Sequence, residues 1–299
     1  MPSALCTIET CVGGPRKSIV WSNSPQQSLG RYIGRWRSNQ VPDKLEGQVA
    51  VITGGGRGIG QAIAVALAGE GATVVVSSRN KAELDWTVAE AKGLGVDALA
   101  VVADATDRLQ AHRPVEEALA QFGRVDIVVP NVGGVAGMHT SLDGGNEGFE
   151  ATLLLNLTSA WWTIQSAMPA MRAARYGRIV TIGSTEALRA NDGGPPGYVA
   201  AKHGLVGLTK QLAQDCGAFG ITANCICPGW TNTAMVDFKK TAAHMGIAEA
   251  EARAYATDRA ALGCILDPED IAAMALMLVS PEGARITGQA ISVDGGYRL

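Results

Sequence analysis

The chain reads Val49-Ala50-Val51-Ile52-Thr53-Gly54-Gly55-Gly56-Arg57-Gly58-Ile59-Gly60 from residue 49 to residue 60. The apolar run at its start predicts a buried β-strand, and apolar residues at helical spacing follow the glycines directly. Glycine lets the backbone turn sharply and approach a ligand, while the first turn of a helix offers free N–H groups and the positive end of its dipole. This stretch therefore predicts a strand, a phosphate-binding turn and a helix. Its glycines match neither GxGxxG nor the GK[ST] ending of a P-loop.

The same alternation continues along the chain. Further apolar runs rich in Val and Ile occupy residues 73–77, 98–103, 125–129, 178–182, 222–227 and 290–293. Helical spacing predicts helices near residues 59–69, 81–93, 107–122, 149–174, 198–217 and 268–280. Parallel strands need crossover connections, which these helices supply. We therefore predict an α/β protein with a single-domain Rossmann fold over residues 45–299, in which helices cover both faces of a seven-stranded parallel sheet. Residues 230–263 interrupt the alternation and predict a substrate lid.

Charge divides the chain into two parts. Residues 1–44 carry six basic and two acidic side chains, a net charge of +4, whereas the whole chain has a net charge of -3, so the remainder carries -7. An acidic body is a poor partner for the phosphate backbone of nucleic acid. We predict a basic, disordered N-terminal extension over residues 1–44, which resembles an organelle-targeting peptide only weakly, and a cytoplasmic protein.

Membrane and metal functions are disfavoured. The segment Ala151–Met171 has no charged residue over 21 positions, but its polar residues and the helical spacing of its apolar ones favour a helix buried in protein over a membrane span. The six cysteines form no CxxC pair and the four histidines are scattered, so no metal site is predicted. Cys225 and Cys227 would lie on one face of a strand, and we predict that both are buried thiols in a reducing compartment.

Several motifs appear in an order that is characteristic of one enzyme family. They are TGxxxGxG at Thr53–Gly60, an acid at Asp104, Asn131-Val132-Gly133, the set Asn156, Ser184, Tyr198 and Lys202, Pro228–Thr233 as PGxxxT, Gly288-Gln289, and Val293–Gly296. Over residues 45–299 the chain thereby resembles the short-chain dehydrogenase/reductase family. Pro130 and Val132 depart from the family's NNAG motif. Ser184 and Tyr198 are 14 residues apart, one more than is usual, and the loop 193–197 has room to absorb the extra residue.

The resemblance implies a role for each member of the Asn-Ser-Tyr-Lys set. Tyr198 and Lys202 are spaced i, i+4, which places both on one face of a helix. A neighbouring ammonium and an oxidised nicotinamide both favour the phenolate, so Tyr198 is the implied general acid/base. Lys202 would also hold the nicotinamide ribose. Ser184 would hydrogen-bond the substrate oxygen, and Asn156 would bind a water that links Lys202 to solvent.

The predicted cofactor is NADP(H), with NAD(H) as the second choice. The second predicted strand ends in Ser77-Ser78-Arg79, without the acid that usually marks selection of NAD. Arg57 and Arg79 would clamp a 2′-phosphate. By resemblance, Asp104 would meet the adenine, Thr233 the carboxamide, and Asn131 would support the cofactor end of the fourth strand. The predicted cofactor-binding residues are Gly54, Arg57, Gly58, Ile59, Gly60, Ser78, Arg79, Asp104, Asn131, Tyr198, Lys202, Pro228, Gly229 and Thr233.

Together these features predict an NADP(H)-dependent oxidoreductase that interconverts a carbonyl and a secondary alcohol, of the 3-oxoacyl reductase, ketone reductase or alcohol dehydrogenase type. Two alternatives stay open: a non-catalytic NADP(H)-binding sensor or scaffold on the same fold, and an NAD-dependent polyol or steroid dehydrogenase. The predicted partners are a small carbonyl or alcohol substrate and further copies of the chain. A homotetramer or homodimer would pair helices 149–174 and 198–217, with Trp161 and Trp162 as anchors. Neither a nucleic acid nor a membrane partner is predicted.

Overall fold

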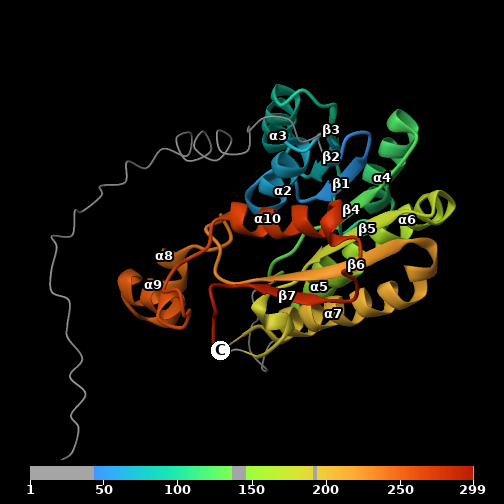
Figure 1. Ribbon diagram of the computed structural model, residues 1–299. Coiled ribbons are helices and arrows are strands. Elements are labelled where there is room, and N and C mark those ends of the chain that lie inside the picture. Colours follow the sequence, from blue (N-terminus) through green and yellow to red (C-terminus); the bar gives the residue numbers. More distant parts are fainter. Residues whose placement is uncertain (1–43, 137–145, 191–193, 299) are drawn as a thin grey trace, which may run out of the picture. The chain divides into compact units, whose positions relative to one another are not determined.

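A single parallel sheet forms the centre of the fold (Figure 1). The computed structural model describes residues 44–136, 146–190 and 194–298, without the side chains of residues 244 and 245. The extension predicted over residues 1–44 lies outside this range except for Lys44, so it stays a prediction. The strands are β1 (Val49–Thr53), β2 (Thr73–Ser78), β3 (Ala98–Val102), β4 (Ile127–Pro130), β5 (Gly177–Ile182), β6 (Ile221–Pro228) and β7 (Ala290–Val293).

The strand order is β3-β2-β1-β4-β5-β6-β7, which confirms the predicted Rossmann fold. The order reverses between β1 and β4, and open α/β sheets bind ligands at such a point, in the crevice beyond the carboxyl ends of the strands. Every predicted strand is present, with its ends within two residues of the prediction. The fold thus places the glycine turn after β1 at the point where the strand order reverses.

Helices cover both faces of the sheet. On one face lie α2 (Gly58–Ala68), α3 (Lys81–Gly93) and α10 (Pro268–Val279), and on the other α4 (Arg108–Phe122), α6 (Ser159–Ala174) and α7 (Pro196–Cys216). Successive strand residues point to opposite faces. Accordingly, Ile52 and Val76 pack in the core of the first face, while Val51 and Val75 pack in the core of the second.

The helix predicted over residues 149–174 is not continuous. A π-helical turn, η1 (Leu154–Thr158), separates α5 (Asn146–Leu153) from α6. Asn156 Nδ2 donates to the carbonyl oxygen of Thr152 at 2.8 Å and to that of Gly134 at 2.7 Å. A π-turn adds a residue to one turn of a helix and so redirects a side chain. Here it directs Asn156 to the loop after β4, a tertiary contact that the spacing along the helix does not reveal.

The predicted lid, residues 230–263, contains two helices that the sequence prediction missed. These are α8 (Phe238–Met245) and α9 (Glu249–Thr257), which stand apart from the layers that cover the sheet (Figure 1). Their packing encloses a small separate core of Phe238, Ala242, Ala252 and Ala256. The segment predicted as a lid is therefore a small helical unit between β6 and α10.

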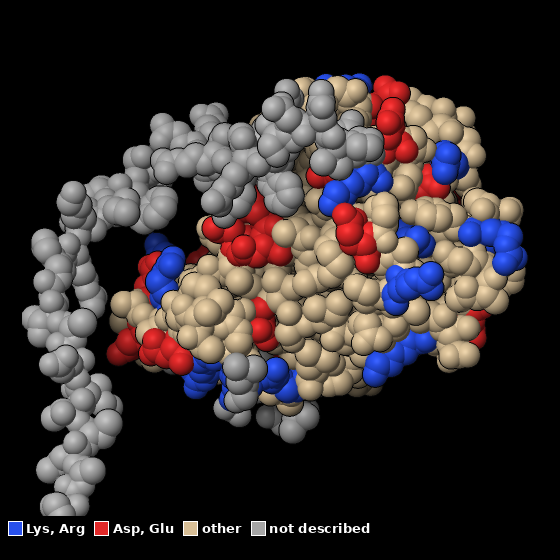
Figure 2. Space-filling view, viewed as in Figure 1, with Lys and Arg blue, Asp and Glu red and all other residues tan. Residues whose placement is uncertain are grey.

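Two further features concern the surface charge and the length of the apolar helices. On the face shown in Figure 2, Lys and Arg side chains form separate spots with acidic or uncharged surface between them. Among the described residues no helix is both long and apolar enough to cross a bilayer. The uncharged segment 151–171 lies in α5, η1 and α6, where its apolar side Ile164, Ala167 and Met171 packs on the sheet.

Candidate active site

The glycine turn between β1 and α2 is fixed to the end of β4 by Asn131. The side-chain Nδ2 of Asn131 donates to the carbonyl oxygens of Thr53 at 3.1 Å and Gly54 at 3.2 Å. Gly54 and Gly58 have φ angles of 65° and 55°, a conformation that glycine adopts at little cost. A Cβ on Gly60 would lie 2.5 Å from Asn131 Nδ2, so α2 approaches the turn this closely only with glycine there. The result is a rigid backbone turn at a helix N-terminus, which suits a pyrophosphate.

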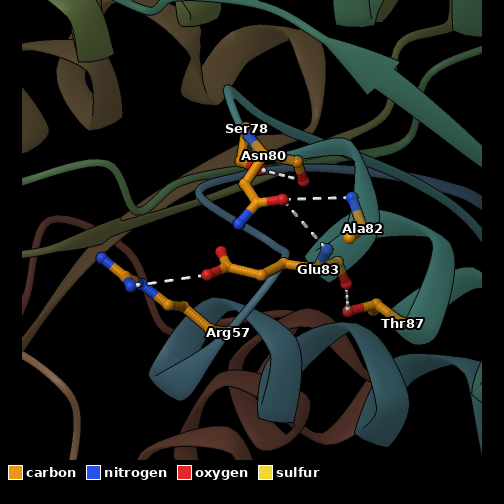
Figure 3. Close-up of polar contacts among 6 residues, drawn as sticks. All are labelled: Arg57, Ser78, Asn80, Ala82, Glu83 and Thr87. Carbon is orange, nitrogen blue, oxygen red and sulfur yellow. Dashed lines mark hydrogen bonds and ion pairs between the residues drawn. The ribbon is translucent and has the colours of Figure 1, made fainter.

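Side chains from the glycine turn and from α3 meet beyond the end of β2 (Figure 3). Arg57 Nη1 lies 3.5 Å from Glu83 Oε1. Asn80 begins α3, because its Oδ1 accepts from the backbone N–H groups of Ala82 at 3.1 Å and Glu83 at 3.5 Å. Ser78 Oγ accepts from the N–H of Asn80 at 3.2 Å. Arg57 and Ser78 thus lie near the end of β2, where the ribose is predicted to bind. The carboxylate of Glu83 forms an ion pair with Arg57 and offsets part of its positive charge.

Arg79 and Asp104 face one another across the loops that follow β2 and β3. Arg79 Nη1 lies 4.0 Å from Asp104 Oδ2. Asp104 Oδ1 also accepts from the N–H of Thr106 at 2.9 Å and from its hydroxyl at 2.7 Å. These hydrogen bonds, with a smaller contribution from the charge of Arg79, hold the pKa of Asp104 below its usual range. Asp104 is therefore an ionised acceptor at the place where the resemblance puts the adenine.

Tyr198 and Lys202 lie one turn apart at the start of α7. Lys202 Nζ is 5.4 Å from the centroid of the Tyr198 ring and donates to the carbonyl oxygen of Ile182, at the end of β5, at 2.8 Å. Lys202 is buried, and this burial lowers its pKa to about 8. Burial disfavours the charged form of Tyr198 as well, but there the charged form is the phenolate, so the pKa rises to about 12. A hydrogen bond with Ser184 opposes this rise. At neutral pH the phenol therefore keeps its proton and the amine is mostly charged.

Ser184 lies two residues after the end of β5 and meets Tyr198 in spite of the longer interval between them. Its side chain begins the short helix η2 (Thr185–Ala187) by accepting from the N–H of Glu186 at 3.2 Å. The hydrogen bond between Ser184 and Tyr198 lowers the pKa of the phenol. The negative charge of Glu186 makes a smaller, opposite contribution and raises that pKa. The structure thus brings Ser184, Tyr198 and Lys202 together.

Asn156 and Lys202 converge on the loop after β4. Asn156 Oδ1 accepts from the N–H of Gly134 at 3.0 Å. A Cβ on Gly133 would stand 2.8 Å from Asn156 Oδ1 and 3.1 Å from Lys202 Nζ, so glycine leaves room for both groups. Both amide hydrogens of Asn156 are used by the carbonyl oxygens of Thr152 and Gly134. Its predicted role in binding a water stays a prediction.

Two thiols lie behind the catalytic candidates. Cys225 and Cys227 of β6 are fully buried with their Sγ atoms 3.9 Å apart, which confirms that they are buried thiols. Gly183 packs on them, because a Cβ there would lie 2.8 Å from the Sγ of Cys225. Within the described ranges no group of three or more His, Cys, Asp or Glu side chains has the geometry to hold a metal ion.

Comparison with known proteins places this site in a family. A family model described as enoyl-(acyl carrier protein) reductase matches residues 54–298. The chain belongs to the short-chain dehydrogenase/reductase family. The 3-oxoacyl-[acyl-carrier-protein] reductase FabG of Thermotoga maritima is 34% identical over 253 residues, 85% of this chain and 98% of that protein. The D-beta-hydroxybutyrate dehydrogenase of Cupriavidus necator is 34% identical over 256 residues, with the same two coverages.

A solved structure of the family agrees. The chain is 35% identical to a blue fluorescent protein from a metagenomic library, crystallised in complex with NADPH. The two align with a TM-score of 0.77, over 86% of this chain and 100% of that one. The predicted family is therefore confirmed.

Other residues predicted to bind the cofactor of this short-chain dehydrogenase/reductase lie at the N-terminus of α2 and after the end of β6. Gly58 and Thr233 are neighbours, since a Cβ on Gly58 would be 3.2 Å from Thr233 Cγ2. Pro228 ends β6, and the N–H of Gly229 donates to the carbonyl oxygen of Val293 at 3.0 Å. Ile59 differs, because its side chain packs against the hydrophobic core.

Three residues of the short-chain dehydrogenase/reductase site were missed by the sequence analysis. Glu83 neutralises part of the charge of Arg57, and the signal for it was its place in the first turn of the helix after β2. Glu186 and Arg189 both follow Ser184 within five residues. Their nearness to Ser184 was the available signal, but their directions depend on how the loop folds.

Proposed function

We propose that this chain is an NADP(H)-dependent oxidoreductase that interconverts a carbonyl group and a secondary alcohol. The observation that carries the proposal is the convergence of Ser184, Tyr198 and Lys202 beyond the end of β5. Together they offer a proton donor, a second hydrogen-bond donor and a positive charge. A protein that only bound the nucleotide would have no need of a tyrosine paired with Lys202 and Ser184, which supports an enzyme over a sensor or scaffold.

The residues along the crevice fit a dinucleotide. The glycine turn offers close backbone approach at the N-terminus of α2, and any Cβ on Gly58 or Gly60 would crowd Thr233 or Asn131. When bound, the nicotinamide would supply or accept the hydride. Lys202 would hold its ribose, Thr233 its carboxamide and Asp104 the adenine. The NADPH bound to the solved relative supports this fit.

Proton transfer falls to Tyr198. In reduction its hydroxyl would donate a proton to the carbonyl oxygen, while the hydroxyl of Ser184 would donate a hydrogen bond to the same oxygen and stabilise the developing charge. The ammonium of Lys202, 5.4 Å from the ring centroid, would stabilise the phenolate that remains. The raised pKa of Tyr198 keeps its proton in place at neutral pH, so the phenol has a proton to donate in the reduction.

The proposed preference for NADP(H) is based on Arg57 and Arg79, which lie where the adenosine ribose of the cofactor is predicted to bind. Arg57, Ser78 and Arg79 surround the end of β2, and a guanidinium pairs well with a phosphate through charge-assisted hydrogen bonds. Glu83 and Asp104 moderate this charge at 3.5 and 4.0 Å from the two arginines. We therefore expect a preference for NADP(H) that is moderate, with NAD(H) as a weaker cofactor.

The test is oxidation of NADPH against a panel of ketones, oxoesters and 3-oxoacyl thioesters, with Tyr198→Phe as the matched variant. We expect turnover in the wild type and a loss of about 10²- to 10⁴-fold in the variant, the usual range for a general acid. Thermal unfolding and NADPH affinity show whether the variant keeps its fold and its site. Turnover that survived the substitution would refute the mechanism, and tight NADPH binding with no turnover of any compound would favour the sensor.

We propose further that the protein forms a homodimer or homotetramer through α6 and α7. These helices border a groove of about 650 Å³, whose apolar lining includes Trp161, Met168, Leu208 and Leu212. An exposed tryptophan beside an apolar groove is typical of an interface anchor. Light scattering tests the proposal: Leu208→Asp should lower the molar mass of the particle, and an unchanged mass would contradict this interface.

We propose a cytoplasmic location on the chemistry of the cysteines. Cys216, Cys225, Cys227 and Cys264 are all free thiols, which supports a reducing compartment. Cell fractionation of the full chain tests this directly, and recovery in an organelle or outside the cell would contradict it.

A further inference from the structure

Three apolar residues from separate segments gather at Gly134, in the loop that follows β4. The methyl carbon of Met235, from the loop after β6, lies 3.7 Å from the place of a Cβ on Gly134. The Cδ2 of Leu155, in η1, lies 4.0 Å from the same place. Val135 follows Gly134 in the chain and is half exposed. Val135, Leu155 and Met235 thus form an apolar patch on this loop.

The apolar patch adjoins two groups of the proposed active site. The N–H of Gly134 donates to Asn156 Oδ1 at 3.0 Å. A Cβ on Gly133, one residue earlier, would lie 3.1 Å from Lys202 Nζ. Consecutive Cα atoms are only about 3.8 Å apart, so Lys202 and Met235 contact adjacent residues of one loop. An alkyl chain on a carbonyl group bound near Lys202 would therefore reach Met235.

The loops that meet at the patch offer apolar surface and no charge. Met235 is 64% exposed, although methionine is an apolar residue. Residues 131–136 and 229–236 include no Asp, Glu, Lys or Arg. Removal of an exposed apolar side chain from water is favourable, and a methionine side chain adapts its shape to different partners. These loops therefore suit an apolar substituent and provide no ion pair for a charged one.

Phe149 of α5 is a second exposed apolar side chain near the proposed site. It is 41% exposed, and its Cδ2 would lie 3.3 Å from a Cβ on Gly197, the residue before Tyr198. In the same helix, Thr152 Oγ1 accepts from the N–H of Ala136 at 3.1 Å, which joins α5 to the loop that carries the patch. Exposed apolar groups therefore border both members of the proposed tyrosine–lysine pair.

We propose that Met235 determines substrate specificity by binding the apolar substituent of the substrate, so that the site favours uncharged ketones with an alkyl or aryl group of several carbons. The inference rests on the proposed function. A carbonyl oxygen bound by Ser184 and Tyr198 would leave the larger substituent against Met235 and Leu155, where water is displaced from both. Hydroxylated substituents would lose hydrogen bonds to water there without replacement, so polyol-like compounds are poor substrates.

A series of methyl ketones measures the contact with Met235. 2-Butanone, 2-hexanone and 2-octanone share the reacting carbonyl and differ only in the length of one chain. Full burial of a methylene group is worth about 4-fold, so we expect wild-type kcat/KM to rise by about 2- to 4-fold per methylene. Met235→Gln keeps the length of the side chain but gives it a polar end. It should reduce the gain from 2-butanone to 2-octanone by about 3- to 10-fold, whereas Met235→Leu should retain most of it.

Leu109→Gln is the matched control. Leu109 is also an exposed apolar side chain, at 79%, but it lies at the start of α4, after β3. Its substitution should leave the dependence on chain length unchanged. The gain is a ratio within one variant, so any common effect on the catalytic groups cancels. A flat series in the wild type, a gain that survives Met235→Gln, or an equal loss in Met235→Leu or Leu109→Gln would overturn the inference.

Equilibrium binding separates this inference from the proposed function. NADP⁺ cannot reduce a ketone, so calorimetry on the protein loaded with NADP⁺ measures binding without turnover. 2-Octanone should bind more tightly than 2-butanone, and Met235→Gln should lose this preference. Equal binding of the two ketones by the wild type would refute the role of Met235. Absence of turnover of every carbonyl compound with NADPH would instead refute the proposed function, and the binding preference would still decide the role of Met235.

Discussion

Arg189 and Tyr297 are 108 residues apart in the chain, and the Nη1 of Arg189 donates to the carbonyl oxygen of Tyr297 at 2.7 Å. Tyr297 is buried, and the segment around it runs beside the end of the lid, where the N–H of Leu262 donates to the carbonyl oxygen of Gly295 at 2.9 Å. One arginine thus connects the loop after Ser184 with the C-terminal segment, and through it with the base of the lid.

Arg189→Met removes this connection. A hydrogen bond from a charged group contributes about 1.5–3 kcal/mol, so we expect a lower melting temperature and a KM for the carbonyl substrate that rises more than kcat falls. Arg189→Lys should restore part of the effect. The matched control is Arg175→Met, because Arg175 also donates to a carbonyl oxygen, that of Ala218 at 2.9 Å, with no contact to this loop. An equal rise in KM in both variants would contradict the special role of Arg189.

Gly133→Ala should inactivate the enzyme. The added methyl would stand 2.8 Å from Asn156 Oδ1 and 3.1 Å from Lys202 Nζ, so one of these groups must move. We expect kcat to fall by about 10²-fold or more, because displaced catalytic groups carry such costs. Gly207→Ala is the control, since nothing lies within 4 Å of a Cβ there in α7, and it should stabilise the fold by about 0.5–1 kcal/mol. A near-normal kcat in Gly133→Ala would contradict the prediction, because it would show that the loop after β4 can shift without displacing Asn156 or Lys202.

Glu83→Gln should strengthen the preference for NADPH over NADH. The carboxylate of Glu83 lies 3.5 Å from Arg57 Nη1, so its removal frees the charge of Arg57 and removes a repulsion from a 2′-phosphate. Because the pair is largely exposed to solvent, we expect a change of only about 3- to 10-fold in the ratio of kcat/KM values. Asp85→Asn removes the same charge from α3, but Asp85 pairs with Lys81 at 2.6 Å, and its ratio should not change. An equal change of the NADPH/NADH ratio in Glu83→Gln and Asp85→Asn would contradict the specific role of Glu83, because any lost negative charge on α3 would then have the same effect.

Lys202→Met should change how stability depends on pH. Burial lowers the pKa of Lys202 from 10.5 to about 8, so the folded state releases this proton before the unfolded state does. The free energy of unfolding of the wild type should therefore rise by up to about 3 kcal/mol between pH 8 and 10.5. In Lys202→Met this rise should be absent.

Urea unfolding at pH 7.5 and pH 10 measures the difference. Tyr198 acts with the opposite sign only above pH 10, because its pKa is raised from 10.0 to about 12 and the resulting stability is lost as pH rises through that window. The comparison below pH 10 thus isolates Lys202. Parallel pH slopes in the wild type and Lys202→Met would show that the amine titrates near its ordinary pKa in the folded protein.

The amino-acid sequence by itself determined the sheet, most of its helices and the pairing of Tyr198 with Lys202. These features depend on periodicity within short segments: alternation along a strand, apolar spacing along a helix, and four residues between two groups on one helical face. The glycine turn after β1 was also readable, because φ angles such as those of Gly54 and Gly58 favour glycine through local sterics alone.

Only the tertiary structure decided which groups meet across the crevice. Asn156 in the π-turn donates a hydrogen bond to Gly134, and Arg57 forms an ion pair with Glu83. Arg189 donates a hydrogen bond to the carbonyl oxygen of Tyr297. Each of these contacts joins segments between 22 and 108 residues apart, and its energy depends on a distance that only the folded sheet sets. For that reason the sequence indicated the chemistry of this site, whereas the arrangement of loops around Ser184 and Glu186 was decided by the fold.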